Sequence, residues 1–322
     1  MNKLVTIAIP VYKRLNTLPQ ALQSVAAQDY PNIELIVSDN GENGSKVKEI
    51  ADQCYPDSYR FRQNPFTVNI SAHYNQLLEE ATGEYFVALD DDDSLSSNFV
   101  SELTRILDKN AQVVVGIAKQ HVVDDAGRIL RQSSDQVPEF LTGGEFIRSW
   151  TSYGYESYST MFAKTSEMRR CRGFPDFPRG THIDDALLIK LCLNGHVAFS
   201  TRCTANWRWV ESSFGWSMEC GQLAEDTRQF LKFLNCDPVI RAFAVREPGQ
   251  WAEFNAILTR LSWSTYLGRW NSIYKEQLPL REWIKAGFAL PFIPEYYWSV
   301  QGAFRYRLMR GFISQAKRLL LA

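Results

Sequence analysis

Four consecutive carboxylates, Asp90 to Asp93, directly follow the apolar run at residues 85–89. Like charges on neighbouring residues repel one another, so their place after a run that looks buried needs an explanation. A solvated turn is one explanation. A cation site is the other, because Asp90 and Asp92 face the same side of an extended chain and carboxylate oxygens suit Mg²⁺ or Mn²⁺. The spacing alone leaves both open.

Two earlier apolar runs also end in segments that could contribute to a site. These segments are Pro10 to Arg14 at the end of the first run and Asp39 to Gly41 at the end of the second. The first of these runs is continuously apolar, which is typical of a strand covered on both faces. Segments with helical spacing lie between the strand-like runs. The expected elements alternate from strand to helix and end on a strand, at residues 4–12, 16–28, 32–41, 45–54, 59–64, 69–82 and 84–90.

This alternation predicts a right-handed, mostly parallel sheet with flanking helices. Ligands of such sheets bind beyond the carboxyl ends of the strands. Residues 10–14, 39–41 and 90–93 all lie at strand ends, so we expect them to face one crevice.

The pattern loosens after residue 98. The predicted elements are strands at 111–123, 155–164 and 196–210, a turn at 124–128, and helices at 143–150 and from Ile183 on. From about residue 219 the pattern is mainly helical, with breaks at prolines such as Pro238 and Pro248. We therefore expect a first domain at 1–215 and a helical C-terminal region at 216–322.

The composition is that of a globular protein, since 45% of the 322 residues are hydrophobic and 22% are charged. A formal net charge of −1 gives no overall attraction to nucleic acid. The six cysteines are scattered without a CxxC pair, which favours free thiols in a reducing, cytoplasmic compartment. Since no apolar stretch reaches roughly 18 residues, we expect no membrane span.

Four segments, in this order and spacing, resemble the inverting family 2 glycosyltransferases: VTIAIPVYKR at 5–14, IELIVSDNG at 33–41, ATGEYFVALDDDD at 81–93 and IDDALLIKLCLNG at 183–195. The resemblance implies the GT-A fold, a Rossmann-like α/β domain that binds a nucleotide-sugar. It also implies an inverting, metal-dependent hexosyl transfer from a nucleotide diphospho-sugar donor to a hydroxyl of a glycan acceptor.

The resemblance assigns the nucleotide pocket to residues after the first two strands. Pro10, Val11 and Tyr12 should contact base and ribose, with Arg14 nearby. The acid after the second strand, Asp39 helped by Asn40, should accept a hydrogen bond from N3–H of the base. An acceptor there suits uracil, and therefore a UDP-sugar, with a dTDP-sugar as the alternative.

One position departs from the family pattern. The resemblance places Asn75 in the nucleotide site, but the residue before it is Tyr74 where the family usually has Arg. A phosphate contact is then missing. Either Arg60 or Arg62 could supply the charge, unless both lie on a solvated strand edge.

The resemblance divides the four acids between two tasks. Asp90 and Asp91 are assigned to the ribose and to local structure. Asp92 is the first candidate to bind Mn²⁺ or Mg²⁺, and Asp93 is the second.

The second acid pair, Asp184 and Asp185, matches the family element that opens a helix beside the acceptor. Asp185 is then the catalytic base and Asp184 a supporting or acceptor-binding residue. A simpler alternative is that both acids complement the helix dipole. His182 could reach the same site. Many members have a further His that touches the metal, and here only Glu211 or Arg208 could replace it.

Residues 296–322 form a basic amphipathic pattern with neighbouring aromatic residues. Such a helix can lie in a membrane interface, or it can pack on its own domain or on a second subunit of a homo-oligomer. The first case predicts peripheral binding to the cytoplasmic face of the inner membrane. The acceptor would then be lipid-linked, as in surface polysaccharide or O-antigen assembly.

Two other functions stay open. Residues 90–94 loosely fit the D-x-D-x-[ST] element of Mg²⁺-dependent phosphohydrolases, although that element normally ends a first strand and three strands precede it here. The chain could also be a nucleotide-sugar-binding protein without catalysis.

Overall fold

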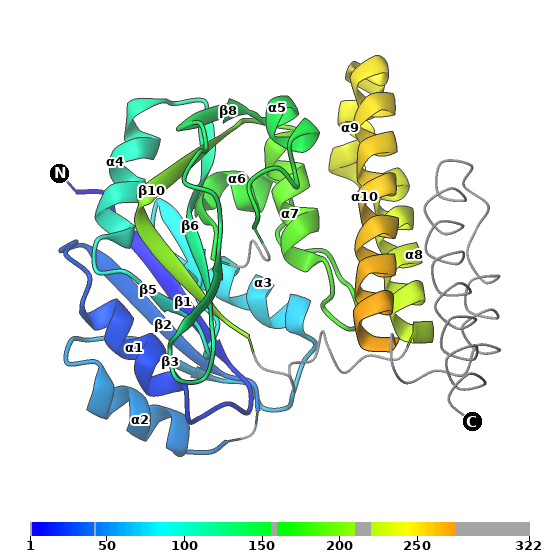
Figure 1. Ribbon diagram of the computed structural model, residues 1–322. Coiled ribbons are helices and arrows are strands. Elements are labelled where there is room, and N and C mark those ends of the chain that lie inside the picture. Colours follow the sequence, from blue (N-terminus) through cyan, green and yellow to red (C-terminus); the bar gives the residue numbers. More distant parts are fainter. Residues whose placement is uncertain (1, 42, 156–159, 210–219, 275–322) are drawn as a thin grey trace, which may run out of the picture. The chain divides into compact units, whose positions relative to one another are not determined.

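The computed structural model in Figure 1 describes residues 2–41, 43–155, 160–209 and 220–274. The chain divides into two compact units, Met1–Arg269 and Trp270–Ala322. The fold described below is that of the first unit. The predicted amphipathic segment 296–322 lies outside the described residues.

The described chain alternates strands and helices from its start. The strands are β1 (Val5–Val11), β2 (Ile33–Asp39), β3 (Arg60–Gln63), β4 (Tyr85–Ala88), β5 (Ser94–Leu95), β6 (Val113–Val123), β7 (Ile129–Gln132), β8 (Phe140–Thr142), β9 (Phe162–Lys164) and β10 (His196–Arg208). The helices are α1 (Leu18–Ala26), α2 (Lys46–Cys54), α3 (Ile70–Glu80), α4 (Phe99–Lys109), α5 (Gly143–Arg148), α6 (Thr165–Arg170), α7 (Ile183–Cys192), α8 (Cys220–Cys236), α9 (Pro238–Arg246) and α10 (Pro248–Tyr274).

All strands belong to one sheet with the order β3-β2-β1-β4-β9-β6-β10-β5, and β7 and β8 pair with β6 and β10. Strands β1 to β4, β6 and β10 run in one direction, and the short strands β5, β7, β8 and β9 run against them. The predicted α/β fold with a mostly parallel sheet is confirmed.

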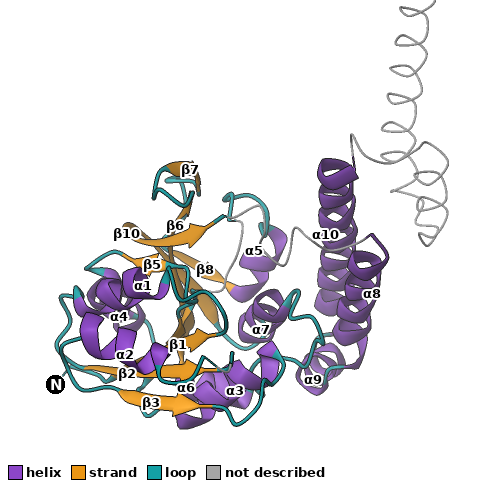
Figure 2. Cartoon of the chain, turned by 90° about the horizontal axis from the view of Figure 1, so that it is seen from below, coloured by secondary structure: helices purple, strands orange, loops and turns teal. Residues whose placement is uncertain are grey.

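Two apolar clusters fill the two faces of the sheet. Alternate β1 residues, including Ile7 and Ile9, pack with α1, α2 and α4 on one face. Ala8 and the residues of α3, α5 and α7 form the other cluster. Figure 2 shows α1 and α2 on one side of the sheet and α3 and α7 on the other. Because every β1 residue is buried, its continuous apolar run correctly indicated a strand covered on both faces.

Helices α8 to α10 extend the second cluster. Phe230, Leu234 and Ile240 pack into it together with Phe254. These helices lie within the first compact unit as far as Arg269, whereas the sequence pattern placed the end of the first domain at residue 215. The expected breaks at Pro238 and Pro248 are confirmed, because each proline begins a helix, where its missing N–H would have no partner within the helix. The other expected breaks, at Pro279, Pro291 and Pro294, lie outside the described residues.

The elements between residues 99 and 170 differ most from expectation. Helix α4 is an addition, since no helix was predicted at Phe99–Lys109. The described part of the strand predicted at 155–164 is β9, which covers only Phe162–Lys164.

The described cysteine side chains are all free thiols, as expected. In the part of the chain that the structure describes, every helix is too short or too polar to cross a membrane.

Candidate active site

The ends of the first four strands lie at one edge of the sheet. Val11 pairs with Asp39 and Asp39 pairs with Gln63 in parallel register. Beyond β4, the Leu89 amide donates a hydrogen bond to the Ala8 carbonyl over 2.9 Å. Strand β1 has β2 on one side and β4 on the other, so the strand order reverses beside it. Ligands of open α/β sheets bind at such a reversal.

The four acids after β4 do not form an exposed turn. Asp91, Asp92 and Asp93 are 7%, 8% and 2% exposed. Burial raises the pKa of the Asp91 carboxyl to about 7. Burial also raises the pKa of Asp90, and burial followed by the Asp90 charge raises that of Asp93. Burial therefore disfavours the charged forms of Asp90, Asp91 and Asp93, and a cation close to them would offset this effect.

The first two acids connect separate elements. The Tyr74 hydroxyl of α3 donates a hydrogen bond to Asp90 Oδ1. The backbone N–H of Tyr12, just after β1, donates to Asp91 Oδ2 over 3.1 Å. Tyr74 stands where the family resemblance leads us to expect an arginine. Asp90 therefore faces a neutral hydroxyl, where an arginine would place a positive charge.

The last two acids have different surroundings. Arg14 forms an ion pair with Asp92 Oδ2, and the Arg14 side chain is 41% exposed. Asp93 Oδ1 accepts the backbone N–H of Arg208 over 2.9 Å. Asp93 Oδ2 is buried and has no hydrogen-bond partner within the described ranges. Asp92 thus faces the Arg14 guanidinium, whereas Asp93 has a buried oxygen that accepts no hydrogen bond from the described residues.

Arg208, at the end of β10, stabilises the turn formed by the four acids. Its side chain donates to the Asp92 carbonyl over 3.0 Å and to the Asp124 carbonyl over 2.9 Å. A third donor reaches the Gln20 side chain. The sequence suggested Arg208 as a stand-in for a metal-binding His, but its guanidinium is committed to these oxygens. Glu211, the other suggestion, lies outside the described residues.

Asp39 is fully buried and supports the loop that follows it. Its Oδ1 accepts from the Gly41 N–H over 2.9 Å and from Asn43 Nδ2 over 2.7 Å, and its Oδ2 accepts from the Asn43 N–H over 3.0 Å. The loop passes so close to β1 that a Cβ at Gly41 would lie 1.5 Å from the Tyr12 carbonyl oxygen. This glycine allows the loops after β1 and β2 to touch.

Asn40 supports the next loop. Its Oδ1 accepts from Asn64 Nδ2 over 2.9 Å and from the Val68 N–H over 3.0 Å, and its Nδ2 donates to the Val68 carbonyl over 2.9 Å. Both lone-pair directions of the amide oxygen are used by the chain itself. Asn40 thus holds the loop at residues 64–68 beside the end of β2.

Asn75 does not present its amide to the crevice. Its Nδ2 and Oδ1 pair with the carbonyl and the N–H of Phe174, each over 2.8 Å. Because these two bonds use the amide on the neighbouring chain, the expected nucleotide contact does not arise from this side chain in the structure.

Both arginines of β3 are engaged in ion pairs with glutamates. Arg60 pairs with Glu34 over 2.9 Å, and Arg62 pairs with Glu80. Strand β3 lies at the edge of the sheet, so these ion pairs agree with the alternative that both arginines lie on a strand edge.

Asp184 and Asp185 lie half-buried in the first turn of α7, as expected. Asp185 Oδ2 is 2.9 Å from His182 Nδ1. His182 precedes the helix with φ +67°, in the left-handed region. The segment before α7 lies on α3: Asn69 Nδ2 donates to Asp176 Oδ1 over 3.0 Å, and the rings of Phe174 and Tyr74 lie 5.0 Å apart. Tyr74 therefore links this segment to Asp90.

The acid run can contribute to a cation site but cannot complete one. Among the residues that the structure describes, no three His, Cys, Asp or Glu side chains are grouped to hold a metal ion. Mg²⁺ is commonly held by one or two carboxylates together with ligand phosphates. The unpaired Asp93 Oδ2 and the rim carboxylate of Asp92 suit such a shared set. The residues therefore fit a divalent cation that arrives with a diphosphate.

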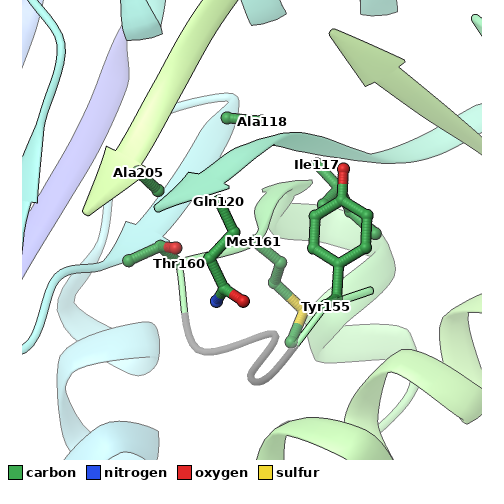
Figure 3. A pocket seen from close by; sticks show the side chains of 7 residues that line it. All are labelled: Ile117, Ala118, Gln120, Tyr155, Thr160, Met161 and Ala205. Atoms are coloured by element: carbon green, nitrogen blue, oxygen red, sulfur yellow. The ribbon is translucent and has the colours of Figure 1, made fainter. Parts of the chain in front are cut away.

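A small hollow lies beside β6 and β10 (Figure 3). Its lining residues are Ile117, Ala118, Gln120, Tyr155, Thr160, Met161 and Ala205. None of the predicted site residues lines it.

Comparison with solved structures confirms the fold. S. aureus TarS 1–349 in complex with UDP-GlcNAc matches with a TM-score of 0.64 at 19% identity, covering 88% of this chain and 79% of that one. The mannosyltransferase PcManGT of Pyrobaculum calidifontis, in complex with GDP-Man and Mn²⁺, matches with a TM-score of 0.55 at 16% identity, covering 94% and 85%. At these identities the likeness is one of fold.

Sequence comparison extends the likeness to named enzymes. The chain is 30% identical over 101 residues to the GalNAc(5)-diNAcBac-PP-undecaprenol beta-1,3-glucosyltransferase of Campylobacter jejuni, which covers 30% of this chain and 32% of that protein. The first curated relatives, from Streptococcus pneumoniae and Rickettsia, are matched over only 16% to 22% of their length.

The sequence model described as glycosyl transferase family 2 matches residues 6–169. This stretch is more than half of the 322 residues and contains β1 from Thr6 on, β2 to β4 and the acid run. The chain therefore belongs to glycosyl transferase family 2.

Proposed function

We propose that this glycosyltransferase moves a hexosyl group, with inversion, from a nucleotide diphospho-sugar to a hydroxyl of a glycan acceptor. The observation that carries the proposal is the buried acid run at the reversal of strand order, with Arg14 at its rim. Asp185, on a helix whose leading segment contacts α3, supplies a second acid of separate function.

The proposed reaction is a single displacement. Asp185 takes the proton of the acceptor hydroxyl through its carboxylate. The acceptor oxygen forms a bond to the anomeric carbon from the face opposite the diphosphate. The bond from that carbon to the diphosphate oxygen breaks, and its electron pair leaves with the nucleoside diphosphate. No covalent enzyme intermediate is needed.

Asp92 and Asp93 are the residues that would hold Mn²⁺ or Mg²⁺. Such a cation, when bound, offsets the charge that develops on the leaving diphosphate. Arg14 lies beside Asp92 and can turn to the phosphates, since its side chain is 41% exposed. Arg208 keeps the acid turn in place through the Asp92 carbonyl.

A uracil base, and so a UDP-sugar, is the preferred donor, with a dTDP-sugar as the alternative. Asp39 accepts three hydrogen bonds from residues 41–43 and a fourth, over 3.5 Å, from Gln63 Nε2 to Oδ2. A carboxylate has about four acceptor positions. The base N3–H would replace the exposed Gln63 amide, which makes the longest of these contacts.

The acceptor is proposed to be a glycan, lipid-linked in surface polysaccharide or O-antigen assembly. This rests on the Campylobacter relative, whose name specifies an undecaprenol-linked glycan. Membrane contact through residues 296–322 and homo-oligomer formation stay predictions. Flotation with liposomes of anionic lipid, with and without those residues, tests the contact directly.

The Asp185→Asn variant tests the reaction. Purified protein is incubated with Mn²⁺ and with UDP-GlcNAc, UDP-glucose, GDP-mannose or dTDP-glucose, and release of the nucleoside diphosphate is measured. We expect turnover of at least one UDP- or dTDP-sugar to fall by about 10²- to 10⁴-fold while nucleotide binding is retained. Asp184→Asn is the matched control on the same helix turn and should lose less.

Three outcomes would count against the proposal. Unchanged turnover in Asp185→Asn would exclude Asp185 as the base. Nucleotide-sugar binding without any turnover would favour a non-catalytic binding protein. Release of phosphate from a phosphomonoester, lost on Asp90→Asn, would favour the phosphohydrolase alternative.

A further inference from the structure

His182 adopts a backbone conformation that costs free energy. Its φ of +67° and ψ of 15° lie in the left-handed region, which side chains other than glycine adopt rarely. His182 also occupies the N-cap position of α7, and its side chain makes no capping hydrogen bond. Strained residues persist where their surroundings hold them, and they concentrate at functional sites.

The side chain of His182 is fixed on two sides. Nδ1 lies 2.9 Å from Asp185 Oδ2. The imidazole ring lies against the ring of Phe230 on α8, with 4.8 Å between centroids and an interplanar angle of 32°. An ionised carboxylate can only accept, so Nδ1 carries the proton in this contact.

Helix α8 also holds the residues just before His182. The Asp226 side chain is almost fully buried and accepts from Arg179 Nε over 2.8 Å and from Thr181 Oγ1 over 2.9 Å. Hydrogen bonds to a buried carboxylate are stronger than those between neutral groups. Residues 179–182 are thus attached to α8 by Asp226 at one end and by Phe230 at the other.

We propose that His182 is a positioning residue for the catalytic base, and that α8 holds it in place. One hydrogen bond to Oδ2 fixes the rotation of the Asp185 carboxyl group and therefore the direction of Oδ1, which receives the acceptor proton. The left-handed backbone conformation of His182 places its Nδ1 next to Asp185 Oδ2. This inference rests on the proposed function, because it assigns Asp185 as the base.

Two substitutions separate the hydrogen bond from the backbone conformation. Both glycine and asparagine tolerate the left-handed region. His182→Gly removes the donor. His182→Asn keeps one, because Nδ2 of asparagine is attached to Cγ as Nδ1 is in histidine. Asp226→Asn tests the attachment to α8 at a distance from the base.

The measurement is steady-state release of nucleoside diphosphate in the presence of Mn²⁺, from whichever of the four donors above the wild type turns over, with the thermal midpoint of each variant recorded. We expect kcat of His182→Gly to fall by about 10- to 100-fold, with KM for the donor within about twofold of wild type. His182→Asn should recover most of the loss. In the Asp185→Asn background, His182→Gly should cause no further loss.

The alternatives give different results. Equal losses of kcat in His182→Gly and His182→Asn, with equally lowered midpoints, would mean a structural role only. Full activity in His182→Gly while Asp185→Asn is inactive would overturn this inference and leave the proposed function intact. Activity retained in Asp185→Asn would overturn the proposed function itself.

Discussion

The backbone N–H of Tyr12 donates a hydrogen bond to Asp91 Oδ2 over 3.1 Å and so joins the end of β1 to the turn after β4. Burial is the main cause that raises the pKa of Asp91 to about 7, and the Tyr12 N–H opposes it. Asp91 therefore changes charge near neutral pH, directly beside the residues proposed to bind the nucleotide. Because the Asp91 carboxyl is buried, we expect its change of charge to alter the free energy of unfolding.

Asp91→Asn should stabilise the protein increasingly as the pH rises from about 4 to about 7. In that window unfolded Asp91 is ionised, with a pKa near 4, while the folded form keeps its proton, so the free energy of unfolding of the wild type falls. The decline due to this group is up to about 1.4 kcal/mol per pH unit. Urea denaturation of both proteins from pH 4.5 to pH 8 measures the difference.

The comparison with the variant is needed because His73 acts in the opposite direction. Burial lowers the pKa of His73 to about 4, so its contribution to the free energy of unfolding rises between about pH 4 and 6.5. Both proteins contain His73, and the difference between them cancels it. A stability difference that stays constant with pH would contradict the assignment to Asp91.

Tyr74→Phe should lower the free energy of unfolding by about 1–3 kcal/mol, because it leaves a half-buried oxygen of Asp90 without its donor. Tyr74 is only 5% exposed, so water cannot readily replace the hydroxyl. The same substitution in an Asp90→Asn background should cost less, since the hydroxyl then faces an amide in place of the Asp90 carboxyl group. Equal costs in both backgrounds would show that the hydroxyl does not act through Asp90.

The alignment of the strand ends could be predicted because it depends on backbone topology. Apolar runs of the right length followed by polar residues determine where strands end, and parallel strands align those ends. This is why Asp39 and Asp91, far apart in the sequence, were expected at one edge. Side-chain partners are a different matter. The pairing of Asn75 with Phe174 depends on a loop almost a hundred residues later, which no local pattern contains.

Helix α4 shows that some of the missing information was present in the sequence. Phe99, Leu103 and Ile106 recur at helical spacing and are all fully buried, and Asn98 stands at the N-cap position. The signal was obscured because the acid run directly precedes it. For Tyr74 the sequence revealed an unusual residue, but its contact with Asp90 became visible only in three dimensions.

Asp92→Asn and Arg14→Ala should change Mn²⁺ binding in opposite directions. Asp92→Asn removes a proposed ligand and should weaken binding of Mn²⁺ alone. Arg14→Ala removes the cation that now pairs with Asp92, and because Arg14 is partly exposed we expect a gain of only about 3- to 10-fold. Titration followed by the signal of free Mn²⁺ in electron paramagnetic resonance measures both. A change in the same direction for both variants would exclude competition between Arg14 and the metal at Asp92.

Asp39→Asn and Gln63→Ala should separate base recognition from loop support. The N3–H of uracil can donate to the Asp39 carboxylate, whereas N3 of cytosine is an acceptor and would repel it. We therefore expect the wild type to bind UDP about 10- to 100-fold more tightly than CDP, from a hydrogen bond worth about 1–3 kcal/mol. Asp39→Asn should reduce this ratio towards one, as measured by calorimetry with Mn²⁺ present.

Gln63→Ala is the matched control, because it removes the longest of the four contacts to Asp39 and leaves the three from residues 41–43. If the base replaces the Gln63 amide, this variant should bind UDP as tightly as the wild type or more tightly, with the UDP-to-CDP ratio kept. Weaker UDP binding in Gln63→Ala would instead mean that Gln63 itself contacts the nucleotide. Asp39 would then support the loop without reading the base.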